Sequence, residues 1–218
     1  MTVQKCDGLR NPIDAYISDE RSPMFGVNSI QDQYDGIVEY VLADYVPEDV
    51  VTQYEVARNL YLYAYNVYRF YMVAEHQALV TLEFAIKECI GSDEIKLYGK
   101  EIKKGQGLAA CLHYVFDKGL VENVDFPIWR HHRKADAEEK FQRKKIKEMI
   151  DKDLDSIEVD YAEIDYEEHT LEYDYLSVLS KIMPNIRNNH AHGSNTLHNN
   201  VRTTFENVST IINKIYKP

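Results

Sequence analysis

The sequence contains little glycine or proline and no long apolar run. Its 9 glycines and 6 prolines are too few for the many tight turns of a β-sandwich, so they favour long helices. No apolar run approaches the roughly 18–20 residues that a membrane-spanning helix needs. The segment 1–16 also lacks the apolar centre of a secretory signal peptide. We therefore expect a cytoplasmic protein that makes no membrane contact.

The sequence also lacks metal-binding and cofactor-binding patterns. The three cysteines, Cys6, Cys89 and Cys111, show no CxxC or CxxH spacing, and an odd number fits a reducing compartment. The histidine pairs in "RHHR" (130–133) and "HAH" (190–192) lack further ligands at suitable spacing, and the first pair is flanked by positive charge that repels a cation. There is no phosphate-binding loop, dinucleotide-type glycine pattern or G-x-S-x-G. We expect no metal and no cofactor.

Positive charge is in deficit, with 25 Lys and Arg against 36 Asp and Glu and a formal net charge of −11. A general electrostatic attraction to nucleic acid is therefore not expected. Any contact with nucleic acid would need a local basic patch.

One segment of the chain has divided charge. Residues 129–147 contain eight Lys and Arg against three acidic residues, and residues 151–175 contain eleven acidic residues against one Lys. The simplest interpretation is a solvated face or a mobile insertion, at about 121–170. The functional alternative is a basic patch beside a phosphate-binding site, with the acidic run opposing it. The RNA-binding candidates in this patch are Arg143, Lys144 and Lys145.

Apolar residues at helical spacing are abundant. From Thr52 to Gly91 they recur every three or four positions, which predicts one helix of roughly ten turns. Thr52 and Glu55 form a capping-box pair at its start, and Gly91 can end it. Further helices are predicted at about 108–118, 171–190 and 200–216. No strand pattern of comparable strength appears, so we predict an all-α fold.

The domain organisation follows from these patterns. Residues 1–46 are turn-rich and have no strong period, although "IVEYVLADYV" (37–46) permits one short helix. We interpret residues 1–46 as an N-terminal extension packed on the main body, and residues 47–218 as a helical domain that carries the charged insertion. The six tyrosines between Tyr54 and Tyr71 are expected to pack with their hydroxyls near water rather than to bind a ligand.

Chemically capable side chains gather in "IRNNHAHG" (186–193). Pro184 predicts a kink or break shortly before it, and Gly193 predicts the end of the helix. A guanidinium can hold a phosphate with two hydrogen bonds, and an imidazole can exchange a proton near neutral pH. Arg187 and His192 lie about 140° apart on a straight helix, so an unwound helix end would be needed to bring them together.

The stretch Arg187-Asn188-Asn189-His190-Ala191-His192 resembles the motif of the HEPN superfamily (higher eukaryotes and prokaryotes nucleotide-binding). That motif is an Arg, four to six further residues and a His, with a polar residue directly after the Arg. "TLEFAIKECIG" also resembles the family's E-x3-K feature, at Glu83 and Lys87. The resemblance covers about residues 52–216. It implies a helical bundle with a long early helix and the motif at the end of the penultimate helix.

Many HEPN proteins are metal-independent ribonucleases that act as dimers. The resemblance implies that Arg187, Asn188 and His192 are catalytic. The residues implied to support them are Glu83, Lys87 and His190. The implied reaction is attack of a ribose 2′-hydroxyl on its own phosphate, which leaves a 2′,3′-cyclic phosphate and a 5′-hydroxyl. The implied partners are RNA, a second copy of the chain and an antitoxin or regulatory protein, in a toxin or antiviral role.

Plainer interpretations stand beside these. Arg187 can pair with an acidic neighbour, His192 can cap a helix end, and Glu83 with Lys87 can form a surface ion pair. One HEPN subgroup carries a modified Tyr two residues after the His, where this chain has Ser194, so that regulation is not expected. The alternative functions are a non-catalytic HEPN-like module that binds nucleotide or protein, and a structural helical protein.

Overall fold

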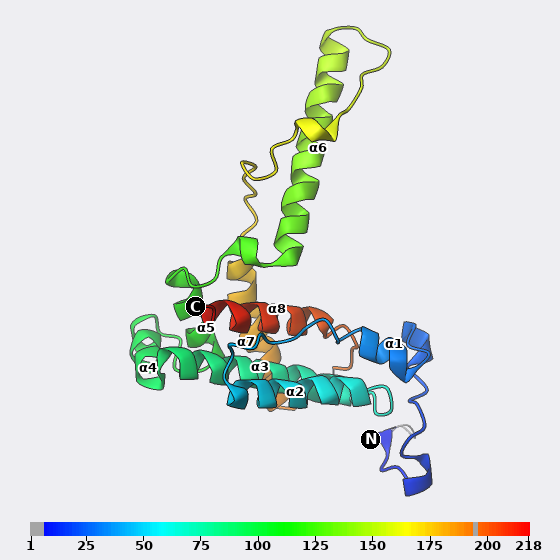
Figure 1. The fold of residues 1–218 in the computed structure, drawn as a ribbon, viewed down its shortest axis with the longest axis vertical. Coiled ribbons are helices and arrows are strands. Elements are labelled where there is room, and N and C mark those ends of the chain that lie inside the picture. The colour runs from blue at the N-terminus through cyan, green and yellow to red at the C-terminus, as the bar shows by residue number, and fades with distance from the viewer. Residues whose placement is uncertain (1–6, 194–195) are drawn as a thin grey trace. The chain divides into compact units, whose positions relative to one another are not determined.

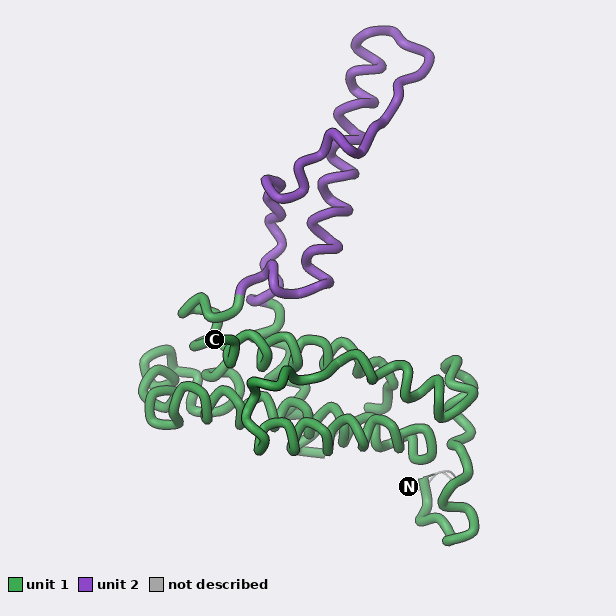
Figure 2. Tube along the Cα trace, viewed as in Figure 1, with its two compact units in different colours: residues 1–121, 178–218 green, residues 122–177 purple. Residues whose placement is uncertain are grey.

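The computed structural model describes residues 7–193 and 196–218, and across these ranges the chain is helical with no strand. The all-α prediction is confirmed (Figure 1). The chain divides into two compact units, with residues 1–121 and 178–218 in unit 1 and residues 122–177 in unit 2 (Figure 2). In the described ranges, no helix has the length and apolar character needed to cross a membrane.

Unit 1 is organised around one central helix, α3. Its helices are α1 (Ile30–Asp35), α2 (Glu48–Tyr63), α3 (Phe70–Ile90), α4 (Ser92–Glu101), α5 (Leu108–Asp117), most of α7 (Tyr175–Ala191) and α8 (Arg202–Ile215). Helix α3 contacts α2, α4, α5 and α8. Its fully buried apolar side chains are Ala74, Ala78, Leu79, Leu82, Ala85 and Ile86. Burial of each larger one contributes about 1.5–3 kcal/mol, which makes α3 the core of the unit.

The single long helix predicted from Thr52 to Gly91 is wrong. Helix α2 ends at Tyr63 and α3 begins at Phe70, and the two pack side by side across the short turn 64–69 (Figure 1). The predicted capping pair is also wrong, because α2 begins at Glu48 without a side-chain cap. Gly91 does end α3, with a φ of +103° that favours glycine.

Asp19 in the N-terminal segment explains the turn between α2 and α3. Its backbone N–H donates to the carbonyl of Tyr65 at 2.9 Å, and its carboxylate accepts from the backbone N–H of Tyr68 at 3.3 Å. Nε of Arg21 donates to the same carboxylate at 2.7 Å. Burial raises the pKa of Asp19, but the hydrogen bonds from Arg21 and Tyr68 outweigh this effect and hold it below its usual value. Asp19, which is distant in the sequence, therefore pairs with the Tyr65 carbonyl and the Tyr68 N–H, which a continuous helix would have paired internally.

The short helix permitted at 37–46 is also wrong, since that segment consists of turns and irregular backbone. The side-chain amide of Asn213 on α8 makes two hydrogen bonds to the backbone of this segment. Its Oδ1 accepts from the N–H of Ala43 at 2.8 Å, and its Nδ2 donates to the carbonyl of Val41 at 3.0 Å. These bonds replace the helical pairing of the segment. Helix α7 continues through Pro184, so the structure contains no break there.

Unit 2 contains one 25-residue helix, α6 (Pro127–Asp151), and an irregular return segment, residues 152–174, that runs back along it (Figure 1). The predicted charged insertion falls in this unit. Acidic side chains of the return segment meet basic ones of the helix: Glu167 lies 3.2 Å from Arg133, and Glu163 lies 3.0 Å from Lys145. The acidic run therefore opposes the basic run. Each exposed pair of this kind contributes only about 0–1 kcal/mol.

We predict that Asp19→Asn destabilises the protein by about 1–3 kcal/mol, because it leaves Arg21 and the α2–α3 turn incompletely satisfied. Urea denaturation at neutral pH measures the change, with the exposed neighbour Glu20→Gln as the control. Because folding lowers the pKa of Asp19, its ionised form stabilises the fold above the usual pKa of 3.8. The difference between wild type and variant should shrink as the pH falls below that value. An equal effect of both substitutions would contradict the proposed role.

Candidate functional site

Arg187 extends from α7 toward α3 and meets the predicted E-x3-K pair. Its Nη2 lies 3.3 Å from Oε2 of Glu83, whose Oε1 accepts from Nζ of Lys87 at 2.5 Å. The Arg187 side chain is 33% exposed and that of Glu83 is 13% exposed. The pair on α3 is therefore more than a surface ion pair, because it also holds the guanidinium. This contact is longer than the 2.7–2.9 Å typical of a charge-assisted hydrogen bond.

Asn188 touches the same guanidinium. Nη1 of Arg187 donates to Oδ1 of Asn188 at 3.3 Å. Nε of Arg187 is buried and has no hydrogen-bond partner in the described part of the chain. The contacts to Glu83 and Asn188 each involve one Nη atom, and each Nη carries two N–H groups, so a second donor on each remains for a phosphate oxygen.

His192 is exposed and directly follows α7, which ends at Ala191. Its backbone N–H donates to the carbonyl of Asn188 at 3.0 Å, and Gly193 follows with a φ of +81°. The helical hydrogen bond therefore continues through His192. The unwinding that would bring His192 beside Arg187 within one chain is not observed, so the structure does not unite the two motif side chains.

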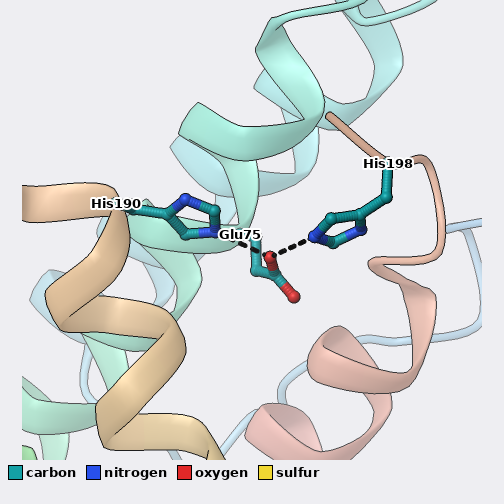
Figure 3. Close-up of side chains that lie close together, drawn as sticks. All are labelled: Glu75, His190 and His198. Carbon is teal, nitrogen blue, oxygen red and sulfur yellow. Dashed lines mark hydrogen bonds and ion pairs between the residues drawn. The ribbon is translucent and has the colours of Figure 1, made fainter. Parts of the chain in front are cut away.

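His190 points inward instead, onto a carboxylate that the sequence analysis missed. Its Nε2 lies 2.8 Å from Oε2 of Glu75, a residue of α3 that is 1% exposed. Nε2 of His198 lies 3.5 Å from the same oxygen (Figure 3). Oγ1 of Thr204 donates to the other oxygen of Glu75 at 2.7 Å. The one sequence signal for this group is Glu75 itself, a charged residue beside the apolar stripe position Ala74 of α3.

His76 completes the surroundings of His190. The two rings lie edge to face with centroids 6.4 Å apart. Burial lowers the pKa of His76, the positive charge of Arg187 lowers it further, and a hydrogen bond to the backbone of Arg187 offsets part of this effect. His76 is therefore neutral near pH 7 and adds no further positive charge to this region.

The three RNA-binding candidates lie on α6 in unit 2. Arg143 pairs with Glu139, and Nζ of Lys145 lies 3.0 Å from Glu163. Lys144 is exposed. Two of these three positive charges are thus balanced by carboxylates of the same unit.

Comparison with protein-family models, with curated proteins and with solved structures yields no match. The HEPN resemblance stays a prediction that depends on the motif and its surroundings. Ser194, the position of the modified Tyr in one HEPN subgroup, lies outside the described residues.

We predict that Glu83→Gln lowers the free energy of unfolding by about 1–3 kcal/mol, because it leaves Arg187 and Lys87 without their shared negative charge. Urea denaturation measures this value. The control is Glu101→Gln, which removes an exposed carboxylate at the end of α4. If the two variants are equally stable, Glu83 is a surface residue with no role in holding Arg187.

Proposed function

We propose that the protein is a metal-independent endoribonuclease of the HEPN type, with a toxin or antiviral role in the cytoplasm. The observation that supports this most is the state of Arg187 at the end of α7. Its guanidinium is held by two 3.3 Å contacts, to Glu83 and Asn188, and each of its Nη atoms retains a second N–H donor. The exposed imidazole of His192 follows on the same helix end.

The proposed reaction uses these side chains as follows. Arg187 binds the phosphate through its N–H donors and stabilises the charge that develops on it. An imidazole of His192 removes the proton of the ribose 2′-hydroxyl, the 2′-oxygen bonds to phosphorus, and the bond from phosphorus to the 5′-oxygen breaks. A second group donates a proton to the leaving 5′-oxygen. The products are a 2′,3′-cyclic phosphate and a 5′-hydroxyl. Asn188 orients the guanidinium, while Glu83 and Lys87 hold it against α3.

A symmetric dimer is part of this proposal. One chain directs Arg187 toward α3 and leaves His192 exposed, so a single copy offers the substrate an incomplete set of groups. A two-fold axis brings the same patch from each subunit together. Each of its two sites then combines Arg187 of one subunit with His192 of the other, which acts as the base.

The basic residues of α6 are the proposed RNA contacts. Phosphates of RNA would replace the carboxylates of Glu139 and Glu163 as partners of Arg143 and Lys145, while Lys144 is exposed. Exposed ion pairs are weak enough for such an exchange. An antitoxin or regulatory protein that controls the cleavage is the further proposed partner.

The second candidate is a non-catalytic HEPN-like module that binds nucleotide or protein. It is favoured by the ion pair of Arg187 with Glu83, which neutralises the guanidinium, and by the separation of Arg187 from His192. Such a module would bind its ligand without cleaving it.

We predict that the purified protein cleaves mixed RNA in the presence of EDTA and leaves 2′,3′-cyclic phosphate ends. His192→Ala should abolish cleavage and change stability by only about 0.3–1 kcal/mol, the usual contribution of a helix-end His. End-group analysis and urea denaturation measure the two effects, and the exposed helical His131→Ala is the control. A requirement for magnesium, or products with 5′-phosphate ends, would exclude the mechanism. Binding without cleavage would favour the module.

We also predict that equimolar Arg187→Ala and His192→Ala subunits, dissociated and reassociated, recover RNA cleavage. If each site combines Arg187 of one subunit with His192 of the other, every mixed dimer has one intact site. Random pairing then restores about one quarter of wild-type activity. Light scattering should show a dimer. No recovery, or a fully active monomer, would exclude a site shared between subunits.

A further inference from the structure

Three possible metal ligands converge in unit 1 from three separate places in the chain: Glu75 on α3, His190 on α7 and His198 in the segment before α8 (Figure 3). Their ligand atoms lie within 4.8 Å of one another. From Oε2 of Glu75, the Nε2 atoms of His190 and His198 are 2.8 and 3.5 Å away. In a tetrahedral zinc site with bonds of about 2.0–2.1 Å, neighbouring ligand atoms are about 3.3 Å apart. Small side-chain shifts would therefore suffice to hold an ion.

The electrostatics of the cluster also suit a cation. Glu75 is 1% exposed, and a buried carboxylate is costly unless its charge is balanced. Its ion-pair partners among the described residues are the two histidines, which are cations only when protonated. With neutral imidazoles the negative charge has no counterpart, and neutral imidazoles are the form that binds metals. The nearby guanidinium of Arg187 is paired with Glu83, which limits its repulsion of a cation.

The surroundings fix the ligands in place. Oγ1 of Thr204 donates to Oε1 of Glu75 at 2.7 Å, which leaves Oε2 to face the imidazoles. Hydrogen bonds of this kind orient carboxylate ligands in metal sites. The side chain of His190 is 8% exposed and that of His198 is 36% exposed, so the cluster is enclosed on one side and accessible on the other.

From this geometry we infer that Glu75, His190 and His198 bind one divalent transition-metal ion, with Zn²⁺ as the best fit to one carboxylate and two imidazoles. A water molecule would take the fourth position. The ion would join α3, α7 and the segment before α8, and so fix the helix end that carries Arg187. Its role is structural, and it takes no part in the proposed RNA cleavage. This differs from the sequence-based expectation of no metal, which treated His190 and His192 as a pair.

The test is titration of the full chain, purified without a polyhistidine tag and stripped by a chelator that is then removed. Isothermal titration with ZnCl₂ should give one ion per chain. His198→Ala is expected to weaken binding by roughly 100-fold or more, because one of three ligands is lost. His192→Ala and His131→Ala are matched controls that each remove an exposed histidine, and both should bind as wild type does. Absence of binding, or equal binding by His198→Ala and wild type, overturns the site.

Three further measurements test for a folding defect and identify the ligands. His198 is the preferred target because it is the most exposed of the three ligands. Circular dichroism should show that this variant is folded, and Zn²⁺ should raise the melting temperature of wild type but not of the variant. The Co²⁺-loaded wild type should show the visible absorption of a tetrahedral site, and loss of that band in Glu75→Gln identifies the carboxylate. An unchanged band in Glu75→Gln removes Glu75 from the site and overturns the proposal. Zinc binding without RNA cleavage would leave this site intact while excluding the ribonuclease, so the two proposals fail separately.

Discussion

The buried carboxylate of Glu75 is the constraint on which the geometry of the motif depends. It binds Thr204 of α8 and His190 of α7, and loss of either partner would leave a buried charge less well compensated. His190 and Arg187 are three residues apart and so share a face of α7. Once His190 is held on Glu75, Arg187 must also face α3, where it meets Glu83. His192, two residues further on, is consequently directed away and is exposed.

This arrangement separates the two histidines of the HAH sequence into different roles. His190 is nearly buried and committed to Glu75, so it cannot easily exchange protons with a substrate. His192 is open to solvent and free of that commitment. The family resemblance selects the same residue, His192, on the separate ground of motif spacing. A structural role of His190 is compatible with the proposed chemistry at His192, because His190 fixes the helix end next to which His192 lies.

Periodicity identified the helices that have an uninterrupted apolar stripe, and it failed where distant residues decide the outcome. Helices α5 and α8 lie close to their predicted bounds for that reason. The apolar spacing continues across the turn 64–69, whereas the interaction that stabilises the turn comes from Asp19. Likewise, the E-x3-K resemblance singled out Glu83, which contacts Arg187, but no local pattern encodes the meeting of Glu75 with His198. Such contacts arise from the packing of elements that are far apart in the sequence.

Helix α6 shows how an acidic protein can pair many of its own basic residues. Several of its positive charges lie beside carboxylates of unit 2, as Lys145 with Glu163 and Arg133 with Glu167 show, whereas Lys144 is exposed. Each such exposed pair contributes little to the free energy of folding, so the pairing mainly balances charge. A polyanion can compete for these residues only if it brings several phosphates at once, because release of counterions then favours the exchange. The same reasoning disfavours binding of mononucleotides to α6, since one phosphate gains no such advantage over a carboxylate already held nearby by the chain.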